Sequence, residues 1–127
     1  MCNITRMDTH MINLEQFYAC VGGDVNEVVD RLGGSEDMVK RFLKKFLDDE
    51  SFPLLEKSLQ ENDVKSAFRG AHSLKGVASS LGLKNLYSVS FSITEILRAE
   101  KLEEAKAAFP EVAKEYRQVL DFINELN

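Results

Sequence analysis

One histidine of this chain lies among residues suited to accepting a phosphoryl group. Arg69 precedes His72 by three positions and Lys75 follows it by three, so a helix would bring the three side chains together on one surface. A neutral imidazole is a nucleophile, and two nearby cations favour an anionic, phosphorylated product. We therefore expect His72 to be the phosphoryl acceptor and Lys75 to stabilise the phosphate.

Small residues follow this histidine. Gly76 lies one turn beyond His72, where a glycine inside a helix costs about 1 kcal/mol relative to alanine. Its missing side chain leaves space beside the imidazole, and the small side chains of residues 78–80 project little from the next turn of the helix. We expect Gly76 to permit close approach of a partner protein. Further candidate contacts of that partner are Phe68, Arg69, Ser79 and Ser80.

The same residues also have purely structural interpretations. A lone histidine in a helix is usually half-buried and satisfied by a local hydrogen bond. Arg69 and Lys75 could be solvated surface charges, and Phe68 could belong to the edge of the core. The combination of a histidine with a lysine and a glycine on one surface favours the chemical interpretation.

The helix that must carry these residues is the clearest element of the sequence. Apolar and small residues recur at alternating steps of three and four from Val64 to Leu81, which predicts a helix over about 63–81 that ends at Gly82. Similar patterns predict short helices at 14–21 and 25–32 and long helices at 35–60, 83–100 and 102–126. The polar turn 48–51 and Pro53 interrupt the first long helix, which we expect to be kinked or briefly broken at Pro53. We expect the last helix to continue, with a kink, through Pro110.

Four long amphipathic helices joined by short turns must run antiparallel to their neighbours. The sequence therefore predicts an all-α fold, an antiparallel up-down-up-down four-helix bundle with one or two short N-terminal helices packed on one end. Residues 1–12 show no periodicity and are expected to be loose, and residues 13–127 are expected to form a single domain.

Composition limits the classes of partner. A formal net charge of −5 argues against a nucleic-acid binder, and no apolar run approaches the length of a membrane span. No secretory signal is visible, and the two cysteines, Cys2 and Cys20, make no disulfide framework, so we expect a buried thiol at Cys20 and a cytoplasmic protein. No metal-binding motif is present, and a monomer is expected because every amphipathic segment has a place in the core.

The run Ala71-His72-Ser73-Leu74-Lys75-Gly76, followed by Gly82 and Leu86, resembles the signature of histidine phosphotransfer domains. The resemblance covers about residues 42–97. It implies that His72 is phosphorylated at Nε2, that Lys75 assists phosphate binding and that Gly76 permits docking. The implied partners are receiver domains of response regulators and hybrid histidine kinases. Their aspartate and Mg²⁺ perform the chemistry, so the resemblance implies no cofactor for this chain.

The resemblance implies that the chain is a phosphorelay intermediate rather than a self-sufficient enzyme. It would accept a phosphoryl group on His72 from a receiver aspartate or a kinase and pass it to a response-regulator aspartate, with no kinase activity of its own. The alternative is a non-catalytic helical adaptor that binds receivers or kinases without phosphotransfer. The sequence leaves open the upstream kinase, the downstream regulator, the direction of flow and whether the chain is free-standing.

Overall fold

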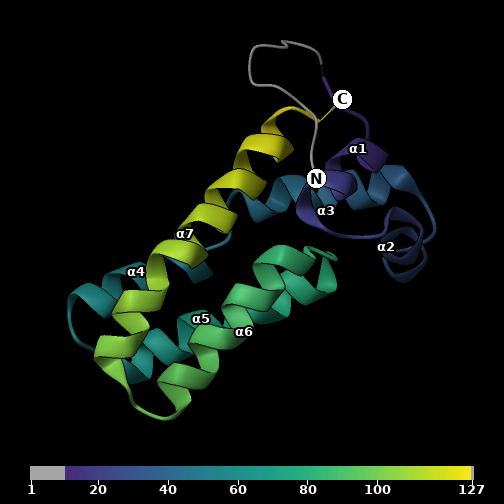
Figure 1. Cartoon of the computed structure of the whole chain (residues 1–127). Helices are drawn as coiled ribbons and strands as arrows, with labels where there is room; N and C mark the ends of the chain where they lie inside the picture. The colour runs from purple at the N-terminus through teal and green to yellow at the C-terminus, as the bar shows by residue number, and fades with distance from the viewer. Residues whose placement is uncertain (1–10, 127) are drawn as a thin grey trace.

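The computed structural model describes residues 11–126, and every regular element within this range is an α-helix (Figure 1). The helices are α1 (Leu14–Val21), α2 (Val25–Arg31), α3 (Glu36–Phe46), α4 (Ser51–Gln60), α5 (Val64–Ser80), α6 (Lys84–Arg98) and α7 (Leu102–Asn124). An isolated parallel bridge joins Ile12 to Leu126.

Four helices form the bundle. α5 packs against α4 and α6, α6 packs against α7, and α4 and α7 close the ring (Figure 1). The loops 61–63, 81–83 and 99–101 are too short to do more than turn the chain back beside itself, so consecutive helices run antiparallel. α7 continues through Pro110, as its apolar rhythm predicted. The all-α bundle expected from the sequence is confirmed.

The first long helix of the prediction is divided into α3 and α4, and the break is not at Pro53. The helices are separated by residues 47–50, where the Asp49 carboxylate accepts a hydrogen bond from the Ser51 N–H at 3.0 Å. Pro53 lies in the first turn of α4, where a missing N–H leaves no intrahelical bond unmade. Proline therefore marks the start of a helix here, and the polar residues before it mark the interruption.

α5 buries a face of small residues. Ala67, Ala71, Leu74 and Ala78 are fully buried, which lets α5 lie close to its neighbours. The Asp63 side chain caps the helix by accepting a hydrogen bond from the Ser66 N–H at 3.1 Å. That hydrogen bond lowers the pKa of the Asp63 carboxyl. The helix ends as expected, with Gly82 in the left-handed region at a φ of +69°.

Gly70 marks the closest approach of α5 to α4. A Cβ atom at this position would lie 2.7 Å from the Leu55 backbone nitrogen and 3.1 Å from the Ser51 carbonyl oxygen. Both are backbone atoms, so relief requires α4 and α5 to move apart.

We expect Gly70→Ala to lower the free energy of unfolding by about 1–3 kcal/mol, because the added methyl overpacks this contact. Chemical denaturation of the variant and the parent protein would measure the difference. Gly76→Ala is the matched control, since a Cβ atom there meets nothing within 4 Å, and it should not destabilise the fold. Equal stability of all three proteins would contradict the close packing at Gly70.

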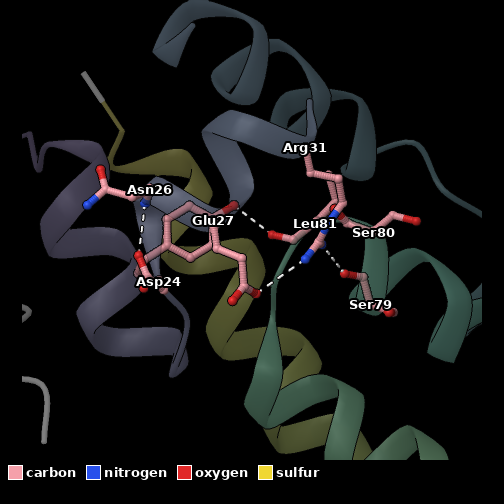
Figure 2. A network of polar contacts seen from close by, with 8 residues as sticks. Asp24, Asn26, Glu27, Arg31, Ser79, Ser80 and Leu81 are labelled. Atoms are coloured by element: carbon pink, nitrogen blue, oxygen red, sulfur yellow. Dashed lines mark hydrogen bonds and ion pairs between the residues drawn. The ribbon is translucent and has the colours of Figure 1, made fainter. Parts of the chain in front are cut away.

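The two short helices pack on the end of the bundle at the C-terminus of α5. Arg31 of α2 donates hydrogen bonds to the carbonyl oxygens of Ser79 and Ser80 and pairs with Glu27 at 3.2 Å (Figure 2). The buried hydroxyl of Tyr18 donates to the Leu81 carbonyl oxygen at 2.6 Å. Burial also raises the pKa of Tyr18. These bonds use carbonyl groups that the end of a helix leaves without intrahelical partners.

Two expectations about the N-terminal region need correction. Ile12 was expected to be loose, but it is buried and its N–H donates to the Glu125 carbonyl oxygen at 2.7 Å. Residues 1–10 of that segment lie outside the described residues. Cys20 was expected to be a buried thiol, but its side chain is half-buried and disulfide-bonded. Because Cys20 is not a free thiol, it no longer supports the expectation of a reducing compartment.

Candidate functional site

His72 lies on the exposed face of α5, between the buried residues Ala71 and Leu74. Its ring stacks on that of Phe68, with 5.7 Å between ring centroids and 14° between ring planes. No hydrogen bond from residues 11–126 reaches either imidazole nitrogen. The imidazole is therefore presented to solvent with both nitrogens unoccupied by this part of the chain.

The two cations beside the histidine have different surroundings. Lys75 is half-buried and places its Nζ 5.5 Å from the centroid of the Phe91 ring, so it leans toward α6. Arg69 is exposed, and its Nη2 donates to the Ser66 Oγ at 2.9 Å. Lys75 is thus held by a cation–π contact with a ring of α6, and Arg69 is held by a hydrogen bond within its own helix.

Packing among the described residues does not require a glycine at position 76. It lies inside α5 with helical geometry, and a Cβ atom added to it would meet nothing within 4 Å. Gly70, six positions earlier, differs because a Cβ atom there would strike the α4 backbone. The helical penalty of Gly76 is therefore not offset by packing within the described residues. Close approach of another molecule to α5 would explain why no side chain covers the helix surface at Gly76.

A groove of about 700 Å³ runs from His72 toward α3. His72, Gly76 and Ser80 line it from α5, and Phe42 and Lys45 line it from α3. Phe42 is 38% exposed, although it belongs to the stripe of apolar residues that runs along α3. The other members of that stripe, Val39, Leu43 and Phe46, already make a complete buried face at four- and three-residue spacing, and this signal leaves Phe42 on the flank.

Ser79 and Ser80, expected as partner contacts, already contribute to the fold through their backbone. Their carbonyl oxygens accept hydrogen bonds from Arg31 Nη1 at 2.7 Å and 3.1 Å, while both side chains are exposed (Figure 2). A cation at the C-terminus of a helix also complements the helix dipole. The sequence did not indicate Arg31, because it is 48 residues from Ser79 along the chain.

No group of three or more His, Cys, Asp or Glu side chains suited to a metal ion occurs in residues 11–126. No helix in the same range is both long and apolar enough to cross a bilayer. The described part of the site therefore consists of an exposed imidazole, its ring partner, flanking cations and an open groove.

Comparison with known proteins identifies a family and a relative of this chain. The family model of the Hpt domain matches residues 37–122. The phosphorelay intermediate protein rdeA of Dictyostelium discoideum is 26% identical to this chain over 104 residues, which cover 80% of the chain. Those residues span 41% of the length of rdeA, so the chain matches less than half of that relative. No solved structure matches the chain.

Proposed function

The chain belongs to the Hpt domain family of histidine phosphotransfer proteins, and from this premise we propose that His72 carries the phosphoryl group. Membership of the family gives the chain a phosphotransfer role in two-component signalling. In the proposed reaction, the donor is either a histidine kinase or a receiver domain, and a receiver domain donates from its phosphorylated aspartate. The acceptor is the aspartate of a response regulator.

The proposed transfer needs a single nucleophile from this chain. The lone pair of His72 Nε2 attacks the phosphorus of an aspartyl phosphate, the N–P bond forms, and the P–O bond to the donor breaks. The donor carboxylate leaves with the electron pair, and the proton on the other imidazole nitrogen is released to solvent. Positioning and charge stabilisation dominate such transfers, so a receiver domain that supplies its aspartate and Mg²⁺ completes the reaction.

The observation that carries this proposal is the pairing of an exposed imidazole with an unexplained glycine. His72 has no hydrogen-bond partner in the described residues, so its nitrogens are available to a donor. Gly76 lies one turn along the same surface, and nothing inside the described molecule requires it to be glycine. A protein surface that must approach the imidazole accounts for both features.

Neighbouring side chains would serve the partner and the phosphate. Lys75 lies one turn from His72, and exchanging its contact with Phe91 for the phosphoryl oxygens would stabilise the product. Phe42 and the groove beside His72 offer an apolar surface to a receiver domain. Arg69, Ser79 and Ser80 are exposed close to the same face and are proposed as rim contacts of that partner.

The proposal is tested by mixing the protein with a phosphorylated receiver domain and following the phosphoryl group. Mass spectrometry at alkaline pH, which preserves phosphohistidine, should find one phosphate on the peptide that contains His72. Mild acid treatment should remove this phosphate. Stable binding of receiver domains without any transfer would contradict the proposal and favour a helical adaptor.

A further inference from the structure

A stack of side chains from two helices lies beside the proposed acceptor. Phe68 of α5 stacks on His72, and the guanidinium carbon of Arg98 from α6 lies 5.0 Å from the centroid of the same phenyl ring. The Arg98 Nε is in turn 3.3 Å from a carboxylate oxygen of Glu95. The surroundings of His72 therefore include a contact that depends on how α5 and α6 pack.

Phe68 is a firmly held surface for the imidazole. It is half-buried, packs against the hydrophobic core, and precedes His72 by four residues, the spacing at which helical side chains meet. Arg98 contacts the ring in addition. An exposed histidine without such a neighbour exchanges between rotamers on the picosecond to nanosecond timescale. Stacking on a ring that is itself fixed narrows the orientations of His72.

We propose that Phe68, held by Arg98, is a positioning residue that orients the His72 ring toward the phosphorus of a docked donor. The inference rests on the proposed function of His72. When the donor is fixed to a protein surface, the attacking nitrogen must lie in line with the breaking P–O bond, and small misplacements slow the reaction strongly. A small donor can approach from any side, so its reaction does not require a particular ring orientation.

Kinetics with two kinds of donor test this inference. Phe68→Leu keeps an apolar side chain and removes the ring, Phe68→Tyr restores a ring, and Phe109→Leu makes the same change in a half-buried aromatic residue of α7. With saturating phosphorylated receiver, Phe68→Leu should slow single-turnover transfer about three- to tenfold, while Phe68→Tyr and Phe109→Leu remain close to the parent rate. The Kd for the receiver and the rate with phosphoramidate, a small phosphoryl donor, should stay within about twofold of the parent values.

Nuclear magnetic resonance reports the stack without any phosphoryl transfer. The carbon-bound ring protons of His72 should move downfield in Phe68→Leu, because a proton above a phenyl face is shifted upfield. Arg98→Gln, which removes the cation but not the ring, should give smaller changes in the same direction in both the spectrum and the receiver-dependent rate. This second variant also decides the matter if Phe68→Leu does not fold.

Two results would overturn the inference. Unchanged His72 signals and unchanged saturated transfer in Phe68→Leu would show that the ring does not orient the imidazole. A weaker Kd with an unchanged saturated rate would make Phe68 a docking contact instead. If the parent protein accepts phosphate from neither receiver nor phosphoramidate, the proposed function fails and the inference fails with it. Normal transfer by Phe68→Leu in a protein whose parent is active removes the inference alone.

Discussion

Replacing His72 by glutamine should abolish phosphoryl uptake while leaving the fold intact. Glutamine has no nucleophilic nitrogen, so transfer from a phosphorylated receiver should fall by more than about a thousandfold. The side chain is exposed and contacts one neighbouring ring, and the free energy of unfolding should change by no more than about 0.5 kcal/mol. Phosphate incorporation measured beside a denaturation curve separates lost chemistry from lost structure.

The chain supplies its own control for this result. His10 is the other histidine of the sequence and lies outside the described residues. A His10→Gln variant should accept phosphate at the parent rate, so the two substitutions together assign the label to one imidazole. Full labelling of His72→Gln would move the acceptor elsewhere and remove the basis of the proposed relay role. Retained receiver binding by His72→Gln would show that docking does not require the imidazole.

The helices were predictable where one local pattern governs them. The alternating three- and four-residue spacing gave a helix over 63–81, and α5 spans Val64–Ser80. The same spacing predicted one helix through Pro110. There, tertiary packing of the apolar face outweighs the tendency of proline to disfavour helical geometry in the residue before it. Pro53 was misleading because proline is unfavourable inside a helix but acceptable in its first turn. The break depended instead on the polar residues before it.

Some residues of the candidate site were likewise predictable from local spacing, and others were not. His72, Lys75 and Gly76 could be grouped from the sequence because helical spacing alone brings them to one surface. Phe42 and Arg98 could not, since each belongs to another helix that the fold brings to this region. Their distance from His72 along the chain carries no signal in a single sequence. Local chemistry was therefore predictable, whereas the surfaces that orient and surround it required the fold.

A substitution at Gly76 can show whether the helix surface there is left open for a partner protein or for packing within the fold. Gly76→Gln should leave stability equal to or above that of the parent protein, because the position is helical and a Cβ atom there meets nothing within 4 Å. The same variant should slow transfer from a receiver domain by about a hundredfold. The longer side chain would stand between the two proteins and hold the reacting atoms apart, and a displacement of about 1 Å is sufficient for a loss of this size.

The interpretation of Gly76→Gln depends on the size of the donor. Phosphoramidate is small enough to reach His72 past a glutamine, so its rate should change much less than the receiver-dependent rate. Ala107→Gln is the matched control, since it lengthens an exposed small residue in the middle of α7 and should leave both rates unchanged. Equal slowing with both donors would mean that the glutamine perturbs the imidazole itself. Normal receiver-dependent transfer by Gly76→Gln would mean that no protein surface comes close to α5 at this turn.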